Sequence, residues 1–413
     1  MATKNVELTG LNQTIQVPDG SRVELIQQTE TPALPHWTRV LRRALQSPIQ
    51  SPPLCELVAH ANLVFLLIPD FTRRIPLSQV MSVLVDVLKT AGLDRHRLGI
   101  MVASATHRAL EDEELEELVG LEVYKEFPVL NHDWRNDDSM VALGSFPDGT
   151  PIRVNDMIKD ADLLIGVGQI RPHRIAGYTG GGKIVLPGIS GPDALGWTHW
   201  LSAHKPSREF THVVDNPIRH AMEKAAEAAG LRFIVNLVMN REGKVAGVFA
   251  GHPVAAHREG VRCAEKIYPC PDGRIFDIVL SLCPSDLDLW QAASGIYEGS
   301  LWVKQGGRLI LWAPCPEGVA PHHPEVLQFG YMSLKDAQEC IAAGKIHDLV
   351  VAAHLAHVGE ILYNEARIAL VSDGIDAKDT ERLHLLYAKD IQTAVDQAYK
   401  EMGQTATMAI YCR

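Results

Sequence analysis

The chain has 413 residues, of which 46% are hydrophobic, so it can bury one large core or two ordinary ones. Its formal net charge of −11 argues against a nucleic-acid-binding protein, which would present a basic stripe. No uninterrupted apolar run reaches the roughly 18 residues of a membrane-spanning helix, so no membrane contact is expected.

The seven cysteines include no CxxC pair, a usage typical of free thiols in a reducing cytosol. The first residues lack the apolar core of a signal peptide. We therefore expect a cytoplasmic protein without a cysteine metal site.

Short apolar runs alternate with segments of helical spacing through the first two thirds of the chain. The runs have the length of buried strands, and the segments between them place apolar residues on one helical face. The pattern predicts strands at 63–68, 98–103, 162–167 and 233–239, and helices at 77–91, 110–119 and 216–230.

The alternation restarts after residues 268–273, which carry two prolines and a glycine. This order predicts an α/β fold of two domains with mostly parallel sheets and an active-site cleft between them. We expect an N-terminal domain over 1–270 and a C-terminal domain over 275–399 that closes over the substrate, while the segment of about 400–413 could pack back on the first domain. Strands are expected at 275–282, 308–312, 349–353, 368–372 and 407–411, and a helix at 295–305.

Polar residues gather where three of the predicted strands end. Residues 70–74 follow the first strand, 104–108 the second and 168–173 the third. Ligands of open α/β sheets bind beyond the carboxyl ends of the strands. We therefore expect these three loops to converge on one site.

A run of glycines ending in Lys183 follows the third strand. Glycine lets the backbone approach a ligand closely, and a lysine amine there can meet a phosphate or bond covalently to a cofactor. The spacing from Gly177 to Gly182 matches a Walker loop, but Ile184 replaces the Ser or Thr that would hold magnesium, which disfavours nucleotide hydrolysis. A surface lysine without a role is the remaining alternative.

Three histidines lie near these loops. His107 and His173 each adjoin an arginine at a predicted strand end, and histidine is the side chain best suited to move protons near neutral pH. His199 stands close to two tryptophans and could ligate a metal. A structural or solvent-facing histidine is the competing interpretation of each. Arg73 suits a substrate carboxylate, or else a salt bridge between loops.

Together these residues resemble the motif set of the nickel-pincer lactate racemase family. No single motif is specific, but five occur in the family's order, and the two-domain layout matches over nearly the whole chain. The motifs are Asp70-x-Thr72-Arg73, Thr106-His107-Arg108, Pro172-His173-Arg174, Gly177-Tyr-Thr-Gly-Gly-Gly-Lys183 with Pro187-Gly188, and His199.

The resemblance implies a cofactor, pyridinium-3,5-bisthiocarboxylic acid mononucleotide, which binds nickel through sulfur, carbon and sulfur. Lys183 matches the lysine that holds it as a thioamide, and His199 matches a further nickel ligand, a donor set that suits Ni(II). Cofactor-synthesis enzymes are then implied partners. Further cofactor contacts are expected from Asp70, Thr72, Gly180, Gly181 and Gly182.

The resemblance also implies a racemase or epimerase that inverts C2 of a small 2-hydroxy acid. His107 and His173 match the two histidines that act as acid and base, and Arg73 matches the arginine that holds the substrate carboxylate. The C2 hydrogen would leave as hydride to the cofactor and return to the other face, so the cofactor carries the difficult step.

The sequence departs from the family in the second domain. A Tyr-Gln-x-x-Lys run of the lactate enzymes corresponds to Trp290-Gln291-Ala-Ala-Ser294, whose Trp290, Gln291 and Ser294 we expect at the substrate. Loss of the lysine removes one electrostatic partner of the substrate, for which Arg74 could compensate. We therefore expect a 2-hydroxy acid other than lactate, such as a larger sugar acid. A cofactor-free organic-acid-binding protein of the same fold is the alternative function.

Overall fold

The computed structural model describes residues 2–8, 11–284 and 287–412. The chain forms two compact units. The N-terminal unit contains Thr29–Thr198 and His212–Tyr268, and the C-terminal unit contains Met1–Gln28, His199–Thr211 and Pro269–Arg413. Each unit holds one six-stranded, mostly parallel sheet, so the predicted α/β class is confirmed.

The sheet of the N-terminal unit has the order β13-β12-β9-β4-β5-β6, in which only β13 is antiparallel to its neighbour. Its central strands are continuous apolar runs because both faces of a parallel sheet are covered. Their bounds are β4 (Val64–Ile68), β5 (Leu98–Val102), β6 (Val129–Asn131), β9 (Leu163–Gln169), β12 (Leu231–Met239) and β13 (Val245–Gly251).

Alternate side chains of these strands enter two different cores. Leu66, Ile100 and Val235 pack with the helices α1 to α5, whereas Leu67 and Ile234 pack with α7, α8 and the glycine-rich segment. The glycine-rich segment is thus laid on one face of the sheet. The helices are α1 (Trp37–Gln46), α2 (Leu54–Ala59), α3 (Leu77–Thr90), α4 (Asp112–Val119), α5 (Leu121–Glu126), α7 (Pro217–Ala228) and α8 (Pro253–Ile267).

Smaller elements complete this unit. Two hairpins are β7 (Met140–Ser145) with β8 (Pro151–Asn155) and β10 (Pro172–His173) with β11 (Gly177–Tyr178). Helix α6 (Pro192–Ala203) carries the chain to the C-terminal unit. The 3₁₀ turns are η1 (Arg95–Arg97), η2 (Asp137–Ser139), η3 (Asp156–Ile158) and η4 (Gly181–Ile184), and η5 (Ser207–Glu209) lies in the C-terminal unit.

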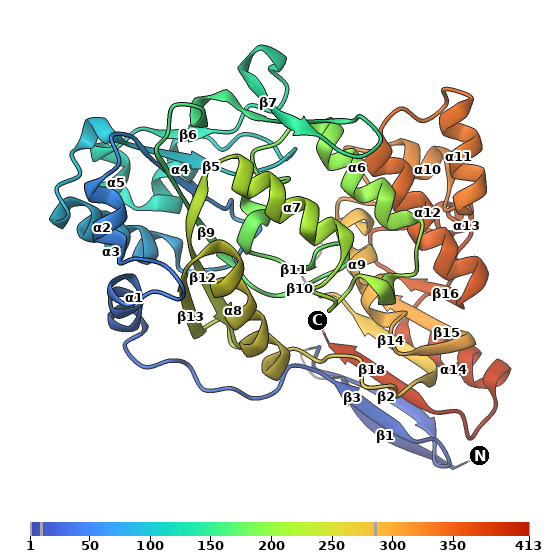
Figure 1. Cartoon of the computed structure of the whole chain (residues 1–413). Coiled ribbons are helices and arrows are strands. Elements are labelled where there is room, and N and C mark those ends of the chain that lie inside the picture. Colours follow the sequence, from blue (N-terminus) through green and yellow to red (C-terminus); the bar gives the residue numbers. More distant parts are fainter. Residues whose placement is uncertain (1, 9–10, 285–286, 413) are drawn as a thin grey trace. The chain divides into compact units, whose positions relative to one another are not determined.

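The sheet of the C-terminal unit has the order β17-β16-β15-β14-β18-β3 and is entirely parallel. Figure 1 shows the N-terminal β3 beside β18 at the end of the chain. The strands are β1 (Thr3–Leu8), β2 (Gln13–Pro18), β3 (Val23–Ile26), β14 (Phe276–Leu282), β15 (Val303–Trp312), β16 (Ala366–Val371), β17 (Leu386–Tyr387) and β18 (Met408–Cys412). The helices are α9 (Leu289–Gly299), α10 (Glu325–Phe329), α11 (Leu334–Ala342), α12 (Leu349–Asn364), α13 (Ala377–Arg382) and α14 (Ile391–Met402).

The division differs from the one suggested by the sequence. The first 28 residues and 199–211 are grouped with the C-terminal part of the chain, although the sequence suggested one domain over 1–270. The physical reason is burial, since Ile15 and Val17 of β2 share an apolar cluster with α14. The last strand completes the C-terminal sheet between β14 and β3.

The predicted strand at 349–353 is wrong, because these residues begin α12. Most of this helix is buried, so its sequence shows apolar residues on all sides and no helical period. The predicted helix at 295–305 begins earlier, at Leu289, where the Asp288 carboxylate caps it by accepting from the backbone N–H of Gln291 at 2.9 Å.

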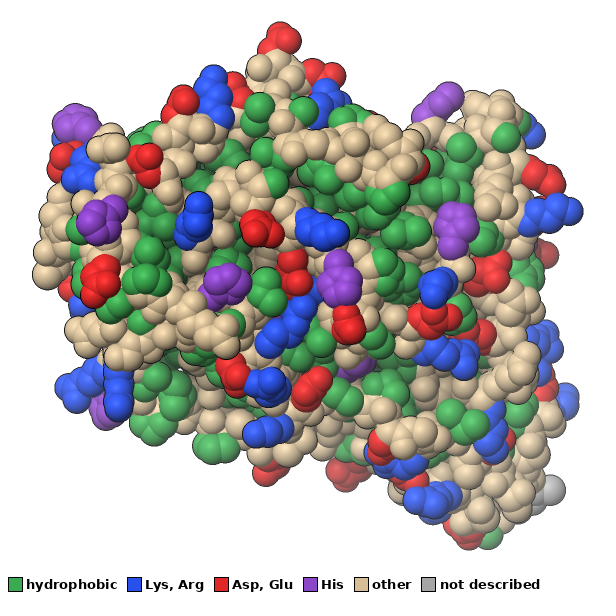
Figure 2. Space-filling view, viewed as in Figure 1, with side chains coloured by type: hydrophobic (Ala, Val, Ile, Leu, Met, Phe, Trp, Pro, Cys, Tyr) green, Lys and Arg blue, Asp and Glu red, His purple; other side chains and the backbone are tan. Residues whose placement is uncertain are grey.

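The charges on the surface are mixed. Acidic and basic side chains are interspersed over the face in Figure 2. Within the described ranges, no helix is long and apolar enough to cross a membrane.

β1 and β2 pair with each other as an antiparallel N-terminal hairpin, which provides a test of the unit boundaries. Ile15 is 2% exposed, so Ile15→Ala should lower the free energy of unfolding of the C-terminal unit by about 2–5 kcal/mol. Thr14→Ala, on the exposed side of the same strand, should change it by less than about 0.5 kcal/mol. Hydrogen exchange by mass spectrometry should show faster exchange in α14 for the first variant only. Faster exchange confined to Thr29–Thr198 would contradict this grouping.

Candidate active site

Three strands of the N-terminal sheet end at the same edge. Because β5, β4 and β9 are parallel neighbours, the loops that carry His107, Asp70 and His173 leave the sheet on one side. The backbone N–H of Ala105 donates to the carbonyl of Gly188 at 2.8 Å, which joins the second loop to the glycine-rich segment. The first and second loops are joined by side chains.

That junction is a hydrogen bond between Asp70 and His107. The His107 Nδ1 lies 2.6 Å from the Asp70 Oδ2, and the other carboxylate oxygen accepts from the backbone N–H of Thr72 at 3.1 Å and from its hydroxyl. Burial alone would raise the pKa of Asp70, but the hydrogen bond and charge of His107 hold it below its usual value. The carboxylate thus stays ionised and orients the imidazole.

The two arginines next to these residues differ in their partners. The Arg73 guanidinium donates to the Thr72 hydroxyl at 3.1 Å and remains beside Asp70, whose pKa its charge lowers. Arg108 forms a two-pronged pair with Glu114 at 2.6 and 2.5 Å, which lowers the pKa of that carboxyl to about 2. Arg108 is therefore held by an exposed ion pair with α4.

His173 closes the hairpin of β10 and β11, opposite Gly177. Its Nδ1 accepts the backbone N–H groups of Ile175 and Ala176, both at 3.2 Å. The turn therefore fixes the ring of His173, just as a carboxylate fixes that of His107.

The glycines before Lys183 are required by the protein's own packing. Gly180 and Gly181 have φ angles of 82° and 59°, which favour glycine. A Cβ on Gly180 would lie 2.6 Å from the Asn236 Oδ1, and one on Gly182 would lie 2.7 Å from the carbonyl of Met222. The loop is pressed against β12 and α7, so any contact of these glycines with a cofactor comes in addition to this role.

The side chain that organises the loop is Arg219, which is 0% exposed. Its guanidinium donates to the carbonyl of Ala176 at 3.1 Å, to that of Gly180 at 3.0 Å and to that of Tyr178. Burial lowers the pKa of Arg219 to about 10, and the side chain still bears its charge at neutral pH. One buried cation thus ties three carbonyls of the loop to α7.

Two further buried side chains hold the loop. The Asn236 Oδ1 accepts the backbone N–H of Gly181 at 2.9 Å, and the His257 Nε2 donates to the carbonyl of Thr179 at 3.0 Å. Sequence reasoning missed these two and Arg219. A signal existed for Arg219, because it interrupts the apolar face of the predicted helix at 216–230, where a polar side chain must have a partner. The helix that carries His257, α8, was not predicted.

Lys183 lies on η4, at the end of this loop. The residue keeps some exposed surface, yet burial lowers the pKa of its amine to about 7, and the charges of Arg73, Arg219 and Arg171 act in the same direction. Asp70 opposes this shift. About half of the amine is therefore neutral, and so nucleophilic, near pH 7.

The local backbone does not resemble a Walker loop. Lys183 lies within a short 3₁₀ turn, and the next α-helix, α6, begins only at Pro192. A Walker lysine instead opens a helix whose N-terminus holds phosphate. The fold thus adds to the argument from Ile184 against nucleotide hydrolysis.

The remaining predicted site residues are grouped with the C-terminal unit. His199 lies on α6, and Trp290, Gln291 and Ser294 lie on α9. The Ser294 hydroxyl donates to the carbonyl of Gln291 at 2.7 Å, so its donor is used inside the helix while its oxygen can still accept a hydrogen bond.

Trp290 is held between two imidazoles. The ring of His323 stacks on it with a centroid distance of 4.0 Å, and that of His354 stacks with a distance of 4.1 Å. The Tyr297 hydroxyl lies 3.0 Å from the His354 Nδ1 and helps to fix this stack. The stack holds the ring of Trp290, a predicted substrate residue, in one orientation.

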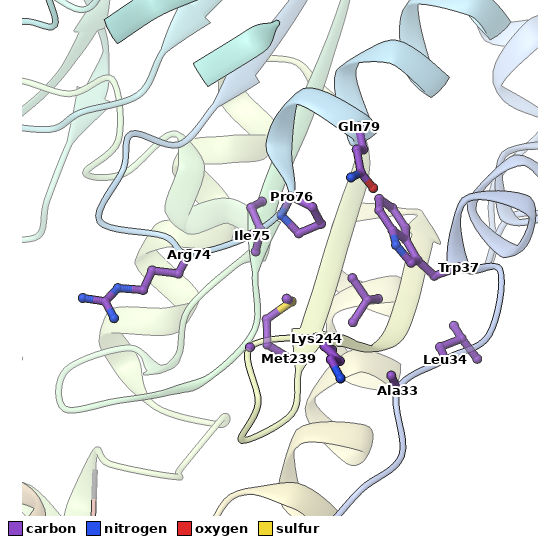
Figure 3. Close-up of a pocket in the computed structure, with 11 residues that line it drawn as sticks. Ala33, Leu34, Trp37, Arg74, Ile75, Pro76, Gln79, Met239 and Lys244 are labelled. Atoms are coloured by element: carbon purple, nitrogen blue, oxygen red, sulfur yellow. The ribbon is translucent and has the colours of Figure 1, made fainter. Parts of the chain in front are cut away.

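Arg74 borders a separate cavity of about 560 Å³ at the start of α3. Figure 3 shows Trp37, Leu34 and Pro76 around this cavity, while the Arg74 guanidinium points away from them. Lys183, His107 and Asp70 are absent from its lining residues, all of which belong to the described part of the chain.

The part of the chain that the structure describes has no group of three or more His, Cys, Asp or Glu side chains able to hold a metal ion. The cofactor implied by the resemblance would itself bind nickel through sulfur, carbon and sulfur. It would therefore need only one further ligand, an imidazole, from the protein. The lack of a three-residue metal cluster among the described residues is therefore compatible with the cofactor that the resemblance implies.

Removal of the buried guanidinium should loosen the loop. Arg219→Met leaves three carbonyl acceptors without a donor, at about 1–3 kcal/mol each, so we expect the free energy of unfolding to fall by about 3 kcal/mol or more. Arg262→Met, an exposed arginine on α8, should change it by less than about 1 kcal/mol. Urea denaturation measures both, and equal stability of the two variants would contradict the role of Arg219.

The amine of Lys183 should titrate near pH 7. Modification by an amine-specific reagent, followed by peptide mapping, should be half-maximal near that pH, because only the neutral amine reacts. Exposed lysines serve as internal controls and should keep gaining reactivity to about pH 10. Arg73→Met should move the midpoint for Lys183 upward, whereas Arg74→Met should leave it in place. An unshifted midpoint in Arg73→Met would contradict the coupling.

Comparison with known proteins identifies relatives of this chain. Residues 10–211 match the family described as the lactate racemase N-terminal domain. A lactate racemase of Lactiplantibacillus plantarum is 29% identical over 90% of this chain and 88% of its own, and one of Thermoanaerobacterium thermosaccharolyticum is 28% identical over 86% and 84%.

Solved structures show the same fold. The lactate racemase apoprotein of Thermoanaerobacterium thermosaccharolyticum aligns with a TM-score of 0.85 at 24% identity, over 99% of this chain and 98% of its own. A protein from Thermotoga maritima aligns with a TM-score of 0.70 at 21% identity, over 90% and 95%. The chain is therefore a homologue of the lactate racemases, and its residues 10–211 belong to the lactate racemase N-terminal domain family.

Proposed function

We propose that the protein is an isomerase that inverts C2 of a small 2-hydroxy acid with a nickel-pincer nucleotide held on Lys183. The names of the two relatives, both lactate racemases that match most of this chain, support the enzyme class. The finer parts of the proposal, namely the cofactor, the roles of the histidines and the substrate, rest on the geometry of the N-terminal unit and on the family resemblance.

The observation that carries the proposal is the state of Lys183. Its pKa of about 7 leaves the amine free to form a thioamide, and the same cationic surroundings of Arg73, Arg171 and Arg219 suit a nucleotide phosphate. A surface lysine without a role would keep a pKa near 10.5.

The residues present fit the proposed cofactor. Lys183 would hold it covalently, His199 would supply a nickel ligand, and Asp70, Thr72 and Gly180–Gly182 border the same loops. When bound, this group supplies the acceptor for the C2 hydrogen. The cofactor-synthesis enzymes would then be obligatory partners in a cytoplasm that contains both.

The histidines handle protons in this proposal. His107 takes the proton of the substrate hydroxyl, and the resulting imidazolium is balanced by the carboxylate of Asp70. His173 faces the substrate oxygen from its own loop. Arg73, beside Asp70, binds the substrate carboxylate.

The residues of α9 favour a substrate other than lactate. Ser294 offers a hydroxyl oxygen where the family has a cation, and Gln291 offers an exposed amide. Such groups suit a 2-hydroxy acid with further hydroxyls, such as a sugar acid. The stacked Trp290 gives this helix a rigid aromatic edge.

Coexpression with cofactor-synthesis enzymes tests the tether. The intact mass should increase by one cofactor, peptide mapping should place the adduct on Lys183, and each chain should carry one nickel. Lys183→Arg should abolish the adduct, the nickel and turnover together, and Lys159→Arg, at an exposed lysine, should abolish none of them. An active enzyme with an unmodified Lys183 peptide would refute the proposal.

Turnover in heavy water separates the alternatives. An enzyme that moves hydride keeps the C2 hydrogen, whereas one that abstracts a C2 proton takes up deuterium there. His107→Ala and His173→Ala should each lower turnover by about 10²–10⁴-fold. A cofactor-free binding protein would instead bind an organic acid equally well in both variants and convert none. A panel of 2-hydroxy acids, lactate included, identifies the substrate.

A further inference from the structure

We infer that the neutral forms of His107 and His173 are opposite tautomers, and that Asp70 is the positioning residue that selects the tautomer of His107. In this arrangement the substrate would meet a bare Nε2 on His107 and an Nε2–H on His173. The catalytic meaning of this asymmetry rests on the proposed function, but the tautomers themselves do not.

The tautomer of His107 follows from the charge of its partner. Asp70 is 7% exposed, and its ionised carboxylate can only accept hydrogen bonds. Its Oδ2 lies 2.6 Å from the His107 Nδ1, which must therefore carry the proton. In the neutral ring, Nε2 is then the bare nitrogen.

The tautomer of His173 follows from the backbone. The N–H groups of Ile175 and Ala176 both point at its Nδ1 from 3.2 Å, and a backbone N–H can only donate. Nδ1 is therefore unprotonated, and the neutral ring carries its proton on Nε2. The same local arrangement recurs at His252, whose Nδ1 accepts from Val254 and Ala255 at 3.3 and 3.4 Å.

The two rings thus differ in what they can do from rest. His107 can accept the hydroxyl proton on Nε2, and the positive charge formed there faces Asp70. His173 can donate a hydrogen bond from Nε2 to the substrate oxygen. A second proton on its Nδ1 would instead face the backbone N–H groups of Ile175 and Ala176, which are also donors. In their neutral forms, His107 is therefore the ring prepared to accept a hydroxyl proton, and His173 is the ring prepared to donate a hydrogen bond.

Asp70→Asn should reverse the tautomer of His107. The backbone N–H of Thr72 must face an acceptor, so the single amide oxygen of the asparagine turns to Thr72 and its NH₂ turns to His107. Nδ1 then becomes an acceptor, and the proton moves to Nε2. The size of the side chain is preserved, so the change isolates the hydrogen-bond pattern.

The test is nitrogen NMR of the histidine rings in the full-length protein, with ¹⁵N-labelled histidine, above the pH at which both rings lose their second proton. Spectra of His107→Gln and His173→Gln assign the two rings. We expect the bare nitrogen, which resonates far from N–H nitrogens, to be Nε2 in His107 and Nδ1 in His173. Two rings of the same tautomer would overturn the inference.

Asp70→Asn should exchange the pattern of His107 and preserve that of His173, which also reports that the variant is folded. Asp94→Asn is the control, since its carboxylate accepts only the backbone N–H of His96, at 2.8 Å, and asparagine caps equally well. In the loaded enzyme, Asp70→Asn should lower kcat on the order of 10⁴-fold, as expected for a wrong tautomer, and Asp94→Asn should not.

An unchanged His107 pattern in Asp70→Asn would remove Asp70 from its positioning role. Failure of the proposed function has a different signature. A wild-type protein that converts no 2-hydroxy acid would refute the isomerase, while the spectra would still decide the tautomers.

Discussion

The site depends on one buried cation, the guanidinium of Arg219. It donates to three carbonyls in the segment that leads to Lys183, and these carbonyls point inward because the guanidinium is there. A glycine-rich loop has many accessible conformations, and ordering it costs more entropy than ordering other residues. The three hydrogen bonds, together with those of Asn236 and His257, offset that cost and select one conformation.

The same cation sets the electrostatics of the site. Arg219, Arg73 and Arg171 all lower the pKa of the Lys183 amine, which is already lowered by burial. A site with so many positive charges favours an anionic guest and an uncharged amine. Asp70 opposes this shift, and its carboxylate accepts hydrogen bonds from His107 and Thr72.

Several loops of the N-terminal unit could be predicted as a group because parallel strands end at one edge. The runs at 63–68, 98–103 and 162–167 were recognisable as strands, so the loops carrying Asp70, His107 and His173 could be expected together. The helix at Leu349 was not recognisable, because a helix buried on all sides loses its period. The place of the N-terminal hairpin was equally hidden, since its partners in α14 come almost 400 residues later.

The sequence by itself determined the α/β class, the chemistry available at each strand end and the resemblance that names the family, because these depend on residue types and short spacings. Only the tertiary structure decided how that chemistry is disposed. It placed Arg219 under the glycine-rich loop, bound Asp70 to His107 and turned two backbone N–H groups toward His173. Burial and hydrogen-bond direction set the pKa of a lysine and the tautomer of a histidine, and both arise from residues that meet only when the chain has folded.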